Sequence, residues 1–411
     1  MAVLSLFSGT FFHVEANLPV LNVWVVDFDN STNPFVGPTI VEIARQYTST
    51  PGYHISFDIM PSSRFEDHLD VRRGVYNQHA WGAVTVLPGA SSRLRNAVAT
   101  ANASYDPSEA CEMVYVSAQD ATTLSSYIIP SLETLQIEAQ NAVGRAWAQE
   151  LFSDSSVNTT AVALVPQAVN PAISFKSVDL RPYGPPQVTP WVSVALIYLI
   201  IIAFFSYTFF MPTHTHFINE MEGHRQMRFH HLIVWKYCST LGAYFFMSLA
   251  YSLVPLMFQV PLNHRHASPV EAVTHANAYG RGTFPVFWMT NFIGMAALGF
   301  ACENVAMLIG QPWTALWLIF WVISNVSTAF YPVVLAPGIY QYGYAFPLHH
   351  VVNATRTLLF DVHSEMGLDL GVLVAWWAVN TALFPFAAWW LRHKVCKPKL
   401  KLKKDEESLE K

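Results

Sequence analysis

Long apolar runs in the C-terminal half constrain the fold of this chain more than any other feature of its sequence. A helix needs about 20 mostly apolar residues to cross a bilayer. Five runs approach or exceed that length: 191–211, 233–260, 284–309, 313–331 and 371–391. Tryptophans stand at several of their ends, as interfacial anchors do: Trp191, Trp313, Trp389 and Trp390. We therefore expect an α-helical membrane domain over residues 191–395.

The preceding part of the chain, residues 15–190, has the composition of a water-soluble domain. Strand-like and helix-like patterns alternate along it, which favours an α/β domain with a mixed sheet. The expected strands are 22–28, 53–59, 81–86, 112–116 and 173–180. The expected helices are 37–47, 63–75, one from residue 91, and 124–151, the last broken at Pro130. A net charge of −5 gives no sign of a nucleic-acid partner.

The N-terminal apolar segment, residues 1–14, is short for a span, because 14 helical residues rise only about 21 Å. It fits the outer part of a first span whose start is missing, a cleaved signal peptide without a basic n-region, or a short or tilted span. All three place the following domain on the same side. We expect the first, and so a bundle of six spans, its first span truncated, with the α/β domain inserted between spans 1 and 2.

Basic residues set the orientation, since they favour the cytoplasmic side. They lie in the connection between the second and third spans and in the tail at 396–411, which is basic and then acidic. Residues 15–190, 261–282 and 332–370 are then extracellular or lumenal, in the plasma membrane or an endomembrane. Three N-x-S/T sequons in the α/β domain agree and are candidate glycosylation sites: Asn30, Asn102 and Asn158.

Polar residues within the apolar region mark a candidate substrate path. Glu303 lies in the fourth run, where a charge costs at least about 2.5–3.5 kcal/mol at the helix centre. It either faces the bundle interior or lies close to the cytoplasmic headgroups, and the sequence does not choose. Segment 332–370 is apolar but interrupted by prolines and glycines, which favours a re-entrant helical pair. His349 and Arg356 lie on it, and with Glu303 they form the candidate path.

Other polar clusters have two readings each. Asp27 and Asp29 follow the first strand, where carboxylates bind metals or cap a turn; we expect the turn. A histidine-rich connection is typical of an interfacial helix or, less often, a metal site: His214, His216, His224, His230 and His231. No nucleotide-binding or catalytic motif is present. We expect no enzyme activity, no cofactor and no metal.

Several motifs together resemble a known family. They are V-V-D-F-D-N (25–30), N-P-F-V-G-P (33–38), W-G-A-V-T-V-L-P-G-A-S (81–91), Y-D-P-S (105–108) and F-P-L-H-H-V-V-N-A-T-R-T-L-L-F (346–360). In this order they resemble the fungal nitrosoguanidine-resistance membrane proteins and, more distantly, the bacterial phage-infection-protein-like permeases. The resemblance implies a membrane domain like that of type-2 ABC exporter permeases. It departs at the N-terminus, where members of the family have a cytoplasmic tail and a complete first span.

The expected function is that of a permease-like protein that exports, or confers resistance to, small hydrophobic or toxic molecules such as a fungal secondary metabolite. The alternative is a non-transporting membrane organiser that affects lipid asymmetry or cell-surface assembly. Expected partners are membrane lipids and small hydrophobic molecules, with a second copy of the chain as a further candidate.

Overall fold

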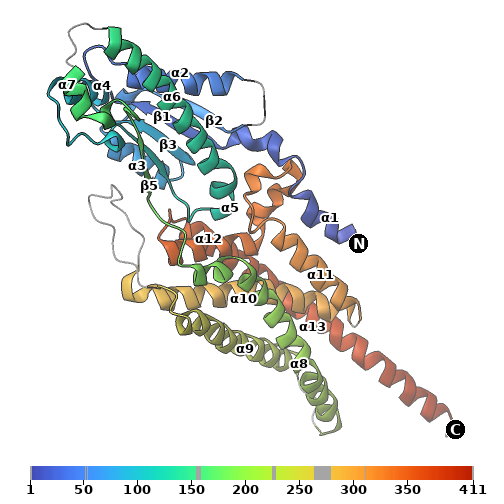
Figure 1. Cartoon of the computed structure of the whole chain (residues 1–411). Helices are drawn as coiled ribbons and strands as arrows, with labels where there is room; N and C mark the ends of the chain where they lie inside the picture. The colour runs from blue at the N-terminus through green and yellow to red at the C-terminus, as the bar shows by residue number, and fades with distance from the viewer. Residues whose placement is uncertain are drawn as a thin grey trace.

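The computed structural model describes residues 2–50, 52, 54–153, 159–224, 228–262, 279–310 and 312–409. An α/β domain lies at one end of the molecule and long helices at the other, with helix α12 (Pro347–Phe360) between them (Figure 1). The expected glycosylation site Asn158 and most of connection 261–282 lie outside the described residues.

A five-stranded mixed sheet forms the centre of the α/β domain. Its strands are β1 (Asn22–Asp27), β2 (Ser56–Met60), β3 (Gly82–Val86), β4 (Cys111–Tyr115) and β5 (Phe175–Asp179). The order is β2-β1-β3-β4-β5, with β4 antiparallel to β3 and the other neighbours parallel. Each expected strand is found, with ends shifted by a few residues.

Alternating side chains of the strands build two separate cores, because successive residues of a strand point to opposite faces. Val23 and Val25 face the core formed with α2 (Val36–Ser49), α4 (Ala90–Ala99) and α6 (Ile129–Ser153). Trp24 and Val26 face the opposite core, which includes α3 (His68–Tyr76). This second core continues without a break into the membrane helices, where it contains Phe287 and the C-terminal half of α12.

Two expected helices of the domain begin later in the structure than in the sequence pattern. Helix α3 begins at His68 because the Asp67 carboxylate accepts a hydrogen bond from the Asp70 backbone N–H, as an N-cap does. Pro130 stands at the second residue of α6, where its missing N–H is not needed. The residues before it form the short helix α5 (Ala121–Thr123) and one π-helical turn over Leu124–Ile128.

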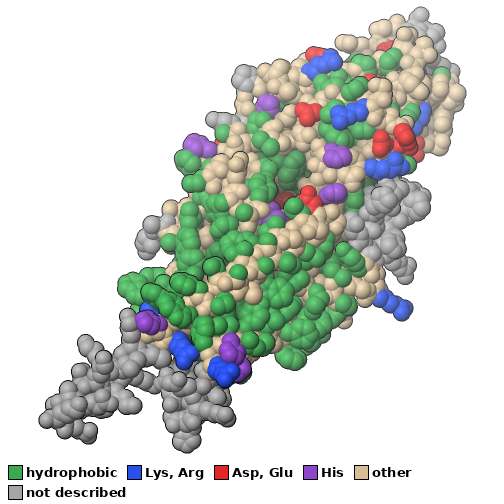
Figure 2. All heavy atoms as spheres, turned by 180° about the vertical axis from the view of Figure 1, so that it is seen from behind, with side chains coloured by type: hydrophobic (Ala, Val, Ile, Leu, Met, Phe, Trp, Pro, Cys, Tyr) green, Lys and Arg blue, Asp and Glu red, His purple; other side chains and the backbone are tan. Residues whose placement is uncertain are grey.

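Four helices among the described residues are long and apolar enough to cross a membrane. The long helices are α8 (Val194–His224), α9 (Phe229–Met257), α10 (Thr283–Ile309) and α13 (Met366–Leu409). Helix α10 is central, since 72% of its apolar window is buried against 44% or less in the others. Figure 2 shows hydrophobic side chains covering this region, with basic side chains and histidines at the end away from the α/β domain.

The fifth apolar run differs from its expected form. Helix α11 (Trp313–Val326) has 14 residues, which rise about 21 Å and fall short of a hydrocarbon core of about 30 Å. The broken segment after it contains 3-10 turns over Val333–Leu335 and Gly338–Ala345 and then α12, in place of a helical pair. Small residues admit α12 into the bundle: a Cβ on Gly294 of α10 would lie 2.8 Å from Val351 Cγ2.

The N-terminal segment packs beside α11 (Figure 1). It consists of α1 (Ala2–Gly9), 8 residues long, and a 3-10 helix over Val14–Val20 that leads into β1. The Thr10 hydroxyl donates to the Ser327 carbonyl at 3.1 Å, and the Asn17 amide donates to the Leu335 carbonyl at 3.0 Å. These bonds fix the segment to the chain that follows α11.

Candidate functional site

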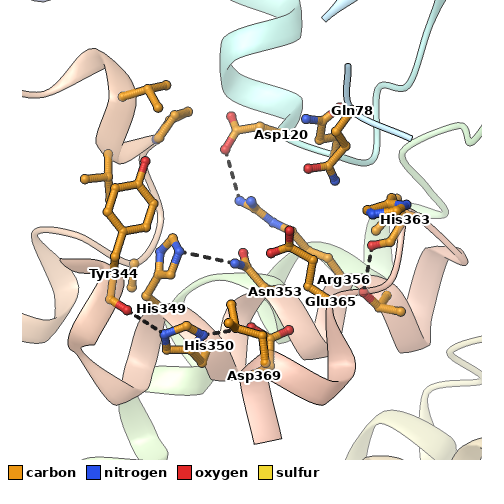
Figure 3. A pocket seen from close by; sticks show the side chains of 18 of the residues that line it. Gln78, Asp120, Tyr344, His349, His350, Asn353, Arg356, His363, Glu365 and Asp369 are labelled. Carbon is orange, nitrogen blue, oxygen red and sulfur yellow. Dashed lines mark hydrogen bonds and ion pairs between the residues drawn. The ribbon is translucent and has the colours of Figure 1, made fainter. Parts of the chain in front are cut away.

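A cavity of about 480 Å³ lies where the α/β domain meets the membrane helices. Gln78, Trp81 and Asp120 line it from the α/β domain, while α12 and the start of α13 supply most of its charged groups. Tyr331 and Val333 add apolar surface. Two of the three residues of the expected substrate path, His349 and Arg356, line this cavity, and Glu303 does not. Figure 3 shows this arrangement.

An ion pair crosses the cavity from one domain to the other. Arg356 Nη2 of α12 lies 3.1 Å from Asp120 Oδ2, and the two side chains are 17% and 4% exposed. The other carboxylate oxygen of Asp120 accepts from the Thr123 N–H at 2.9 Å and caps the short helix α5. One carboxylate therefore orders a helix start and also fixes Arg356.

His349 is held as a neutral ring. Its Nδ1 lies 3.1 Å from the Thr328 carbonyl and its Nε2 lies 3.2 Å from the Asn353 amide nitrogen. A carbonyl only accepts and an amide nitrogen only donates, so the ring carries one proton, on Nδ1. Burial, reinforced by the neighbouring His350, lowers the pKa of His349 to about 4.

His350 has the opposite character. Its Nδ1 lies 2.8 Å from Asp369 Oδ1 and its Nε2 lies 2.8 Å from the Tyr344 carbonyl oxygen. Both partners are acceptors, so the bonds are both made only by an imidazolium. Burial alone would lower the pKa of His350, but the bonds to Asp369 and Tyr344 outweigh it and the net shift is upward. The second carboxylate oxygen of Asp369 is buried without a hydrogen-bond partner among the described atoms.

A second cluster clamps the C-terminal end of α12. Arg181, just after β5, donates to the Asp361 carbonyl and pairs with Asp361 Oδ2, both at 3.0 Å. The Tyr76 hydroxyl donates to the same carbonyl at 3.0 Å. Asp361 ends the helix at φ 55°, in the left-handed region that Asp tolerates better than most residues. Helix α12 is thus held to the α/β domain at two points.

Glu303 is fully buried in α10, so it faces the bundle interior. Its Oε1 lies 3.5 Å from Lys236 Nζ and accepts from the Thr240 hydroxyl at 3.4 Å, both on α9. Lys236 is 3% exposed. It is therefore an intramembrane partner of Glu303 and not a residue of the connection between spans. In the sequence Lys236 is the fourth residue of the run 233–260, so it reads as one of the basic residues of the connection.

The remaining candidates lie elsewhere. The Asp29 carboxylate accepts from Ser31 and from the Ser91 backbone and hydroxyl, and Asp27 accepts from the Asp29 N–H at 2.8 Å, so both order the turn after β1. Asn30 and Asn102 are exposed. No group of three metal-ligating side chains occurs among the described residues. His350 was recognised on segment 332–370 but not included in the candidate path. Asp120 and Asp369 were missed, although the position of Asp369 just before the apolar run 371–391 was a signal for it.

Two comparisons place the chain among known proteins. The family model described as "Protein of unknown function (DUF3533)" matches residues 1–382. A Saccharomyces cerevisiae protein, named an uncharacterized endoplasmic reticulum membrane protein, is 26% identical over 356 residues. The match covers 84% of this chain and 66% of the yeast protein, just under two thirds of that relative's length. With its long apolar helices, this chain is a membrane protein that belongs to the DUF3533 family.

Proposed function

We propose that this protein is a permease-like exporter of small hydrophobic or amphiphilic molecules, including toxic ones. The cavity between the α/β domain and α12 carries the proposal, because it presents charged and apolar surface together at the boundary where a molecule leaving the bilayer first meets water. The resemblance to nitrosoguanidine-resistance proteins and type-2 ABC permeases supports the same reading. In this proposal the short helices α1 and α11 lie in the membrane beside the four long helices and complete a six-helix bundle, and the α/β domain is extracellular or lumenal.

An apolar recess on the bundle surface supports entry from the membrane. It lies between α8 and α9, with a volume of about 540 Å³, and its lining is almost free of polar surface. The lining residues are Ile202, Phe205, Ser206, Phe209, Phe210 and Met247. Such a surface suits an acyl chain or a hydrophobic solute. The proposal makes the protein a carrier and not an enzyme.

Export is tested in cells by the accumulation of a panel of fluorescent compounds that includes the lipophilic cation rhodamine 6G. Deleting the gene should raise the retention of at least one compound in the cells. Expression of the wild-type chain should restore the efflux of that compound. Glu365→Arg, at the exposed rim of the cavity, should reduce restoration for cations and spare neutral compounds. Glu133→Arg, on the exposed side of α6, is the matched control. Unchanged accumulation of every compound on deletion would reject export.

The attachment of α12 favours a second candidate, a membrane organiser without transport. Two ion pairs and a continuous core join the α/β domain to the bundle. Such an attachment suits a scaffold that holds the α/β domain in a fixed position on the membrane helices. If the protein is an organiser, deleting the gene should alter the distribution of lipids between the two leaflets and leave efflux unchanged. Headgroup labelling of intact cells measures the lipid distribution.

A further inference from the structure

A stripe of polar residues runs along one side of α9. Residues at four-residue intervals lie on one face of a helix. In α9 this face carries Lys236, Thr240, Tyr244, Ser248 and Ser252, and all are buried. The opposite side of α9 is apolar and exposed, as a lipid-facing side should be. Small polar groups on the buried side of a membrane helix join neighbouring helices by hydrogen bonds, whereas an ionisable group among them marks a functional site by default.

Helix α10 supplies polar partners at both ends of the stripe. Near the α/β domain, the Asn291 amide donates to the Ser252 hydroxyl at 2.9 Å and Trp288 Nε1 donates to the Ser248 hydroxyl at 3.2 Å. Towards the other end, Glu303 meets Thr240 and Lys236. The two helices therefore enclose a polar seam, which we define as the α9 stripe with these α10 partners.

Three polar atoms in the seam are fully buried and lack a hydrogen-bond partner among the described atoms. They are Tyr244 Oη, Asn291 Oδ1 and Glu303 Oε2. An unsatisfied buried polar group destabilises the fold, and more so when it is charged. A purely structural seam would be expected to satisfy them. Acceptors left open on Glu303 and Asn291 are instead what a passing proton or its water carrier needs.

Lys236 has other stabilising contacts besides Glu303. Its ammonium lies 2.9 Å from the Met307 sulfur, 5.0 Å from the Tyr207 ring centroid and 5.8 Å from that of Phe384. Cation–π contacts are stronger when they are desolvated. The lysine charge is therefore still supported when the charge of Glu303 is neutralised, so the pair can exchange a proton without leaving a bare cation.

We propose that the seam is a proton path and that Glu303 is the group that takes up the proton which drives export. One proton adds to Oε2 of the carboxylate from one side, the carboxylic acid loses it to the other side, and no other bond changes. A metal cation is disfavoured because the Lys236 ammonium stands 3.5 Å from the same carboxylate. The proposal rests on the proposed export function. The titratable groups around Glu303 among the described residues are Lys236 and Tyr244 of α9, Tyr207 of α8 and Cys302 of α10.

Carbodiimide labelling tests the protonation of Glu303 independently of transport. Dicyclohexylcarbodiimide is membrane-soluble and reacts with protonated carboxyl groups. With the full chain in lipid vesicles, mass spectrometry should find Glu303 modified, and more at acidic than at alkaline pH. Glu303→Asp should keep the adduct at that position and Glu303→Gln should lose it. An unmodified Glu303 at every pH, in a sample whose other carboxyls react, would overturn the proposal.

Transport in proteoliposomes tests the coupling. Rhodamine 6G movement by the wild-type chain should accelerate severalfold under an imposed pH gradient and fall to the no-gradient rate in Glu303→Gln, with Glu303→Asp partly active. The control Ser193→Ala, at a half-buried residue just before α8, should behave as wild type. If the wild-type transport rate is the same with and without the pH gradient, the proposed coupling is refuted and the proposed export function is not. Absence of any transport by the wild type refutes export for this probe and coupling with it, while the labelling result still decides protonation.

Discussion

Arg356 joins α12 to the α/β domain by a single ion pair with Asp120. Replacing Arg356 by Ala leaves a buried carboxylate without its cation, and removal of one partner of a buried pair costs about 3–5 kcal/mol. Because Arg356 is 17% exposed and lines a cavity, we expect about 2–4 kcal/mol. Thermal unfolding of the detergent-solubilised protein measures the loss. Arg45→Ala, in an exposed pair with Glu42, should change stability by no more than about 0.5 kcal/mol. Equal effects of the two variants would contradict this account.

His350 should make stability depend on pH. Its folded-state pKa is raised above the ordinary value of 6.5, so its stabilising contribution is complete below pH 6.5 and is lost as the pH rises through the folded pKa. His350→Gln should therefore have a lower melting temperature than wild type at acidic pH, and the gap should narrow at alkaline pH. Asp369, Glu365 and His349 surround the ring and are present in both proteins. A gap that stays constant with pH would show that His350 is not charged.

Helix packing in the bundle depends on close approach at Gly299 of α10. A Cβ there would lie 2.6 Å from Tyr244 Cζ of α9 and 2.8 Å from Ala203 Cβ of α8. Overpacking a core typically costs about 1–3 kcal/mol, so Gly299→Ala should lower the melting temperature and displace Tyr244 in the seam. Gly242→Ala on α9 meets no atom within 4 Å and should be neutral or stabilising. Equal stability of both variants would mean that the helices separate without penalty.

Helix α12 takes its place between two environments because its sequence suits both. Its buried residues include apolar ones that meet α10, while His349, His350 and Arg356 face the cavity. A helix that combines an apolar surface with fixed charges is stable only where protein covers the first and polar partners meet the second. This explains why segment 332–370 does not read as a simple span.

The orientation of the whole molecule remains a prediction that glycosylation can test. If the α/β domain is lumenal or extracellular, the exposed residues Asn30 and Asn102 should carry glycans. Endoglycosidase treatment should then reduce the apparent mass of the wild type, and the double variant Asn30→Gln, Asn102→Gln should lose all or most of that shift. An unmodified wild type would remove the support that the sequons give to the orientation.

The helices and strands were largely predictable from sequence. Burial on one face makes apolar residues recur at the spacing of a helix or strand, and burial on both faces gives a continuous apolar run. The valine-rich run NVWVVD at 22–27 is typical of a buried strand, and the long helices follow from apolar length. The site was less predictable. Arg356 and Asp120 are 236 residues apart, and nothing local to either residue indicates the other.

The sequence by itself determined a membrane domain of long helices and a separate α/β domain, since hydrophobic periodicity and run length are local properties of the chain. Only the tertiary structure decided which charges meet. Lys236 reads as one more basic residue near a span end until α9 packs on α10 and brings it to Glu303. His350 acquires its charge only when α12 folds against Asp369 and Tyr344. Pairing of buried charges depends on distance in space, which hydropathy along the chain does not encode.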